Sequence, residues 1–199
     1  MLDDRPADTV DVGRIGPNAV IQLGHAVTDR LGRDAAERLY GAAGQLDLLR
    51  EPPEGMVDEA LPARLFAVLW QMHPDTASEL AWDAGRRTAD YVIARRISLA
   101  ARLVFAIAPR QIGTRLLLQA IARNAWTFAG SGQCETAIGE CPSITITNNP
   151  LIMPGGFWHA AVLQRLFERL VASGTEVRQT SDSDLQTRHC RFDIVMPIR

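Results

Sequence analysis

The chain changes character at Gly130, and this change restricts the fold more than any other feature of the sequence. Before Gly130, apolar residues recur at helical spacing, as in Val20, Leu23 and Val27. After it, short runs rich in Ile, Thr and Val alternate with polar residues, which is typical of strands. Because helices and strands are segregated along the chain, the sequence predicts an α+β fold rather than a parallel α/β sheet.

The helical half contains five predicted helices and one apolar segment. Asp34 and Asp75 are the predicted N-caps of the second and fourth helices. The last helix is the most apolar and is expected in the centre of the core. The helices are expected at 17–31, 34–43, 58–72, 75–98 and 111–128, with an apolar segment at 99–108 that Pro109 ends.

The C-terminal part predicts two strands, a helix and two more strands, with the last two strands antiparallel. The expected architecture is therefore N-terminal helices packed with an antiparallel sheet of about four strands. Residues 1–16 are expected to form a flexible arm, and 17–199 a single domain whose helical part is 17–129. The predicted elements after Gly130 are strands at 134–140 and 143–147, a helix at 157–172, and strands at 175–180 and 189–196.

The composition excludes several function classes. All 21 basic residues are arginine, so a lysine Schiff base and the Walker phosphate loop are impossible. The net charge of -2 gives no reason to expect nucleic acid as a partner. The nearest dinucleotide pattern, Gly130-Ser-Gly132, follows a helix rather than a strand and lacks a third glycine. Gly155-Gly156 before a helix is read as a plain turn rather than an anion site.

The three cysteines, Cys134, Cys141 and Cys190, are an odd number, and no signal peptide is visible. We therefore expect free thiols in a reducing cytoplasm. No apolar run approaches the roughly 20 residues that a membrane span needs.

Aromatic and histidine residues make a pocket for a porphyrin or another flat apolar ligand the leading candidate for a site. His159 follows Trp158 at a helix start, where a neutral imidazole can ligate a metal. His73 lies at a helix end, and Trp126 and Phe128 supply apolar surface. The alternative is that the aromatics are core residues and the histidines are caps or surface groups.

Five segments in a fixed order carry a resemblance to a known family: Cys141-Pro-Ser-Ile-Thr145, Asn148-Asn-Pro150, Trp158-His-Ala-Ala-Val-Leu-Gln-Arg-Leu-Phe167, Thr175-Glu-Val-Arg-Gln-Thr180 and Cys190-Arg-Phe-Asp-Ile194. Their order and spacing resemble the 4-vinyl reductase domain over about 110–198. Most of the chain is similar to the bacteriochlorophyll-pathway branch of that family. The resemblance implies a fold similar to dimer-forming subunits of vesicle-tethering complexes, and hence a homodimer.

The resemblance implies reduction of a vinyl group on a divinyl Mg-tetrapyrrole. A reductase needs a hydride source, and the sequence contains no recognisable nicotinamide, flavin or iron–sulfur site. We therefore expect no intrinsic cofactor, and a protein that binds the divinyl Mg-tetrapyrrole and presents it to other bacteriochlorophyll biosynthesis enzymes. The first alternative is a genuine 4-vinyl (8-vinyl) reductase of divinyl protochlorophyllide or chlorophyllide that uses NADPH, and the second is a ligand-sensing interaction module.

Some relatives of the resembled domain have a Glu-Cys-Cys zinc site. At the matching positions this chain has Gln179, Asp182 and Cys190, so only the last ligand is retained. No metal site is therefore expected, and Cys190 is read as a small buried hydrophobe.

Overall fold

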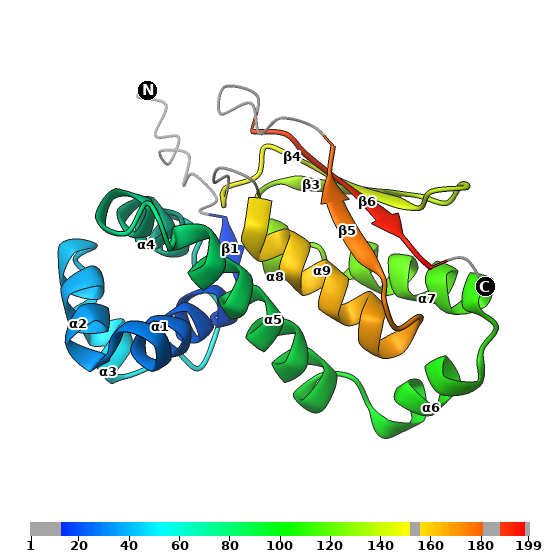
Figure 1. Cartoon of the computed structure of the whole chain (residues 1–199), viewed down its shortest axis with the longest axis horizontal. Helices are drawn as coiled ribbons and strands as arrows, with labels where there is room; N and C mark the ends of the chain where they lie inside the picture. The colour runs from blue at the N-terminus through cyan, green and yellow to red at the C-terminus, as the bar shows by residue number, and fades with distance from the viewer. Residues whose placement is uncertain (1–12, 152–155, 181–187, 198–199) are drawn as a thin grey trace, which may run out of the picture.

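The computed structural model describes residues 13–151, 156–180 and 188–197 and has the predicted α+β class (Figure 1). The helices before Gly130 are α1 (Asn18–Leu31), α2 (Arg33–Ala42), α3 (Leu46–Arg50), α4 (Ala60–Met72), α5 (Ala77–Arg95), α6 (Leu99–Ile107), α7 (Arg110–Arg123) and α8 (Trp126–Ala129). A two-stranded ribbon, β1 (Arg14–Ile15) and β2 (Val57–Asp58), lies among them. The remaining elements are β3 (Gln133–Ala137), β4 (Ser143–Thr147), α9 (Phe157–Leu170), β5 (Glu176–Gln179) and β6 (Cys190–Val195).

Strands β3 to β6 form one antiparallel sheet in the order β3-β4-β6-β5. Alternation along the strands places apolar side chains on one face, where Ile144 pairs with Phe192 and Val177 with Ile194. Helix α9 packs against this apolar face (Figure 1). The other face carries Thr145, Arg191 and similar polar residues. A one-faced pattern of this kind is typical of antiparallel sheets.

Helix α9 lies between α5 and the sheet (Figure 1). Its contact with α5 is unusually close. A Cβ placed on Gly85 of α5 would lie 2.4 Å from the backbone oxygen of Trp158 and 2.7 Å from the Cβ of Ala161. Only glycine permits this separation, so Gly85 sets how deeply the start of α9 sits in the core.

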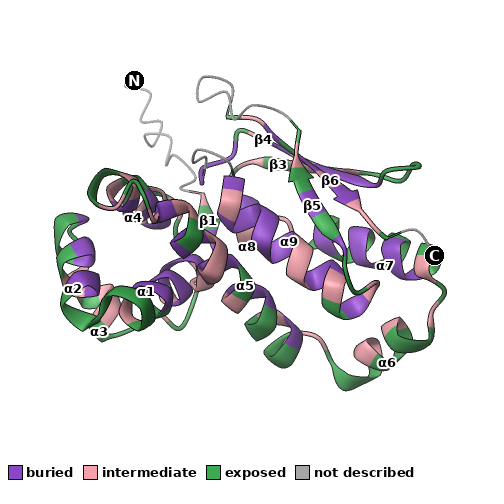
Figure 2. Ribbon diagram, viewed as in Figure 1, coloured by how far each residue is buried: buried purple, intermediate pink, exposed green. Residues whose placement is uncertain are grey.

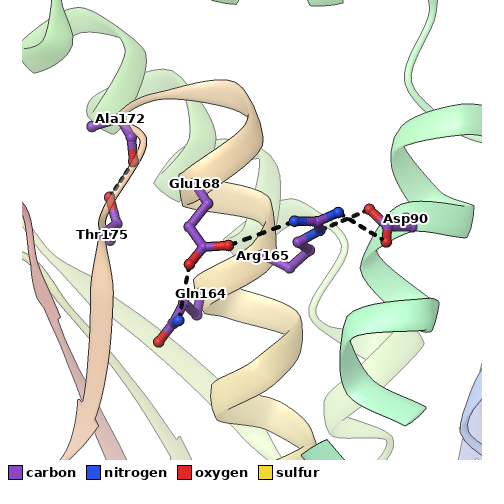
Figure 3. Close-up of polar contacts among 6 residues, drawn as sticks. All are labelled: Asp90, Gln164, Arg165, Glu168, Ala172 and Thr175. Atoms are coloured by element: carbon purple, nitrogen blue, oxygen red, sulfur yellow. Dashed lines mark hydrogen bonds and ion pairs between the residues drawn. The ribbon is translucent and has the colours of Figure 1, made fainter. Parts of the chain in front are cut away.

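Polar side chains in the second half of α9 fix it to its neighbours (Figure 3). Arg165 donates to both carboxylate oxygens of Asp90 in α5, at 2.9 and 3.3 Å. Gln164 accepts a hydrogen bond from the backbone N–H of Val177 in the edge strand β5, at 3.1 Å. The same glutamine donates to Glu168 at 2.9 Å. Helix α9 is therefore tied to α5 on one side and to β5 on the other.

The predicted arm boundary and two predicted N-caps were wrong. Ile15 is fully buried in β1, so the predicted arm 1–16 extends too far, and residues 1–12 lie outside the described residues. Neither Asp34 nor Asp75 is an N-cap, because Gly32 and Thr76 occupy those positions. Asp34 instead lies in the first turn of α2, where a carboxylate still favours the helix dipole.

The helix predicted at 111–128 is two helices, and it is not central. Asn124 ends α7 and donates from its side chain to the backbone oxygen of Ala120 at 2.8 Å. One face of α7, including Leu118, is buried, but Ile112 is 52% exposed and Trp126 of α8 is 55% exposed. Apolar content therefore did not reveal which face of this helix has a partner.

Candidate functional site

The start of α9 places the leading candidate residue in the core. Gly156, the N-cap, has a positive φ of 51°. A Cβ there would lie 2.6 Å from Oε1 of Gln179 and 3.1 Å from the ring of Phe192, so any side chain would force both neighbours to shift. The helix then begins with Phe157, and the next two side chains, Trp158 and His159, are each only 2% exposed.

The hydrogen bonding of His159 defines its chemical state. Its Nε2 lies 3.1 Å from the backbone oxygen of Phe128. Because a carbonyl oxygen can only accept, Nε2 carries the proton and Nδ1 holds a free lone pair. Nδ1 is buried and has no hydrogen-bond partner within the described part of the chain. His159 is therefore a neutral imidazole with an unused acceptor directed into apolar surroundings.

Aromatic rings surround this imidazole. Its centroid is 4.9 Å from that of Trp158, 6.3 Å from Phe128 and 6.1 Å from Phe192. The indole Nε1 of Trp158 is also buried without a partner in the described residues. Buried polar atoms are almost always paired, so two unpaired atoms on adjacent residues call for an explanation.

The structure thus brings together three of the five residues predicted to bind a ligand, namely His159, Trp158 and Phe128. Phe192 completes the cluster, and sequence reasoning missed it. The available signal was alternation along β6, which turns Cys190, Phe192 and Ile194 to the covered face.

The other two predicted residues lie apart from this cluster. His73 follows the last turn of α4, where its Nε2 is buried without a partner in the described residues. Trp126 is more than half exposed at the start of α8. No ring contact or hydrogen bond among the described residues joins either one to His159. Their role in ligand binding stays a prediction.

Burial disfavours the charged form of His159 and lowers its pKa to about 4, an effect that the Phe128 carbonyl partly offsets. The unfolded chain binds a proton below about pH 6.5, whereas the folded chain does not until about pH 4. Stability should therefore fall as the pH drops through this window, by about 2 kcal/mol between pH 7 and pH 5. Denaturant unfolding of the wild type at both pH values measures this loss. The same loss in the His159→Gln variant would contradict this assignment, because glutamine does not titrate.

The glycine pattern Gly130-Ser-Gly132 binds a carboxylate of the chain itself. The N–H and the hydroxyl of Ser131 both donate to Glu59, each at 2.7 Å. A Cβ on Gly130, whose φ is 56°, would lie 2.2 Å from the same carboxylate. The carboxylate of Glu59 thus occupies the glycine turn that comes closest in the sequence to a phosphate-binding pattern.

The cysteines have no metal partners among the described residues, where no group of three metal-ligating side chains occurs. Cys190 is buried on β6, where its sulfur lies 3.7 Å from the Asn149 amide nitrogen. Burial raises the pKa of this thiol, and it also raises the pKa of Cys134 to about 11. Of the positions matched to the zinc site of the resembled domain, Asp182 lies outside the described residues.

Comparison with known proteins gives a fold and a family. No protein-family model matches the chain, so the resemblance to the 4-vinyl reductase domain stays a prediction. Among solved structures, the unliganded Fe(II) H-NOX protein from K. algicida has a TM-score of 0.62 at 7% identity, covering 93% of this chain and 98% of that one. A structure described as probing heme distortion in the H-NOX family has a TM-score of 0.58 at 11% identity, covering 93% and 99%. This likeness shows a shared fold.

Two curated relatives match nearly the whole chain. The bacteriochlorophyll synthase 23 kDa chain of Cereibacter sphaeroides is 40% identical over 190 residues, covering 92% of this chain and 90% of the relative. The protein of the same name from Rhodobacter capsulatus is 34% identical over 192 residues, covering 94% and 89%. The chain therefore belongs to the family of the bacteriochlorophyll synthase 23 kDa chain, the J protein of the bacteriochlorophyll biosynthesis cluster.

Proposed function

We propose that the chain binds a divinyl Mg-tetrapyrrole intermediate of bacteriochlorophyll biosynthesis and presents it to pathway enzymes. The state of His159 carries this proposal. A histidine that ligates a metal almost always donates its other ring N–H to a carboxylate or backbone carbonyl. His159 has this arrangement, with Nε2–H donated to Phe128 and Nδ1 free.

Two comparisons support a tetrapyrrole as the ligand. The relatives of the chain take their name from bacteriochlorophyll synthesis. One of the structures that share its fold is described in terms of heme, which is itself a metal-tetrapyrrole. A family tied to one tetrapyrrole pathway and a fold found with another tetrapyrrole favour the same class of ligand.

In this proposal, Nδ1 of His159 is the fifth ligand of the Mg²⁺ that the substrate carries. Phe128, Trp158 and Phe192 contact the flat macrocycle, and the free N–H of Trp158 donates to a carbonyl at its edge. Because His159 is nearly fully buried, entry requires a neighbouring ring to move. Phe128 is half-buried, whereas Trp158 and Phe192 are buried. Rotation of the Phe128 side chain therefore disturbs the packing of the core less than movement of either other ring. The backbone carbonyl of Phe128 can keep its hydrogen bond to Nε2 of His159 during this rotation.

A carrier accounts for the site better than a genuine vinyl reductase. Hydride transfer from NADPH needs a place for the pyrophosphate, and Glu59 already occupies the nearest glycine turn. Binding and presentation require only the aromatic cluster and the free imidazole nitrogen.

The test is a titration of purified full-length protein with divinyl Mg-protoporphyrin monomethyl ester, followed by NADPH in the same cuvette. We expect the porphyrin absorption band to shift and then to stay unchanged when NADPH is added. Loss of one vinyl group, detected by mass, would establish the reductase instead. Absence of any band shift would refute tetrapyrrole binding.

A further inference from the structure

Helix α6 turns its apolar side chains towards solvent. None of its residues is buried (Figure 2). Its exposed positions are all apolar: Leu99, Ala100, Leu103, Val104, Ala106 and Ile107. Ile107 is 83% exposed and Leu99 is 64% exposed. The single charged residue of the helix, Arg102, is half-buried on the opposite side. Surface helices of soluble proteins normally have the reverse orientation, so this face lacks a partner.

The apolar surface continues from α6 onto α7. Phe105 on the inner side of α6 approaches α7, since its ring would lie 4.0 Å from a Cβ on Gly113. Next to Gly113, Ile112 is 52% exposed, and Leu116 is 36% exposed. We call this region the α6–α7 surface; its large members are Leu99, Leu103, Val104, Ile107, Ile112 and Leu116. An exposed apolar surface of this kind, spread over two neighbouring helices, marks an interaction site.

The segment that contains this surface is strongly basic. Residues 91–134 contain six of the 21 arginines, and none of the 23 acidic residues. Every ion pair found among the described residues lies outside this segment. Arg95 and Arg96 precede α6 and Arg115 lies on α7, all three exposed. The partner of the α6–α7 surface should therefore be both apolar and negatively charged.

We propose that the α6–α7 surface docks on an anionic lipid bilayer. An interfacial helix inserts its apolar face at the boundary of headgroups and acyl chains, while nearby arginines contact lipid phosphates. A second copy of the chain fits less well. A two-fold interface would bring two acid-free basic segments together without any carboxylate to pair with. No helix in the described part of the chain is long and apolar enough to cross a membrane, and docking at the surface needs none.

The test is co-sedimentation of the full chain with vesicles of phosphatidylcholine alone or mixed equally with phosphatidylglycerol. The wild type should bind the anionic vesicles at least about tenfold more tightly, and added salt should weaken the binding. Ile107→Asp should lower that affinity at least about tenfold, because it places a charge on the inserted face. Ile138→Asp is the matched control: Ile138 is 55% exposed outside the surface, and its variant should bind like the wild type.

A double variant, Arg95→Gln with Arg96→Gln, tests the charge contribution and should reduce anionic-vesicle binding by about tenfold. Equal binding of wild type and Ile107→Asp would overturn the proposal, as would no binding to either vesicle. If the wild type is a dimer and Ile107→Asp converts it to a monomer, the proposal is overturned. The α6–α7 surface would then bind a second copy of the chain. The vesicle assay needs no tetrapyrrole, so its outcome is separate from that of the porphyrin titration.

Discussion

Replacing Gly85 by alanine is expected to destabilise the chain by about 2–3 kcal/mol. The new Cβ would lie 2.4 Å from the Trp158 backbone oxygen, and backbone cannot move aside as a flexible side chain can. The loss exceeds the gain of up to about 1 kcal/mol that alanine normally brings to a helix interior. Denaturant unfolding measures the change in the free energy of unfolding.

Gly41→Ala is the matched control for this prediction. Gly41 is exposed within α2, and nothing lies within 4 Å of its Cβ position, so alanine should stabilise the chain by about 0.5–1 kcal/mol. The two glycine variants should therefore change the free energy of unfolding in opposite directions. A Gly85→Ala variant as stable as Gly41→Ala would mean that α5 and α9 do not approach each other this closely.

Removing the imidazole of His159 is expected to lower the affinity for divinyl Mg-protoporphyrin monomethyl ester at least about tenfold. Loss of outer-shell hydrogen bonds alone typically reduces metal affinity by about 10–100-fold, and loss of the ligand itself should have at least that effect. His159→Ala, titrated by the porphyrin absorption band, measures this change. His25→Ala, at an exposed position of α1, should bind like the wild type.

Added imidazole separates the loss of a ligand from the loss of structure. The cavity left in His159→Ala can accept free imidazole, which would restore the fifth ligand of Mg²⁺. We expect imidazole to recover most of the lost affinity in this variant and to have no such effect on the wild type. Unchanged affinity of His159→Ala, with an unchanged absorption band, would show that His159 does not contact the ligand.

The sequence predicted the order of the elements well, because that order depends on local periodicity. The strand at 143–147 was located to the residue, since Ile144 and Ile146 alternate with polar neighbours. The last two strands pair antiparallel, as predicted. Helix α3 was not predicted: it spans five residues and has no buried side chain, so it leaves no apolar periodicity to detect.

The site could be predicted only in part. The Trp158-His159 pair at a helix start was a local signal, and Phe128 was named only as an aromatic that supplies apolar surface. Contact of these residues with Phe192 depends on β6 lying beside β4, which no local pattern specifies. The packing of α9 against the core depends likewise on Gly85. In the sequence this residue cannot be distinguished from any other glycine within a helix.

Some residues that carry the family resemblance have structural roles. Asn149 is fully buried, and its side chain accepts a hydrogen bond from the Leu151 N–H at 2.9 Å. Its own backbone N–H donates to the backbone oxygen of Arg188, also at 2.9 Å. Asn148 has a positive φ of 52°, which asparagine tolerates better than most residues. This motif therefore joins the end of β4 to the start of β6 and does not take part in the aromatic cluster.

The most direct test of the central claim is ¹⁵N NMR of histidine-labelled protein with and without divinyl Mg-protoporphyrin monomethyl ester, a diamagnetic ligand. Near pH 7 the free protein should show His159 as a neutral imidazole protonated at Nε2, because burial lowers its pKa to about 4. On binding, the Nδ1 resonance should shift strongly while Nε2 keeps its proton, and His159→Gln should lack both signals. A bound porphyrin that leaves both His159 resonances in place would contradict coordination by this residue.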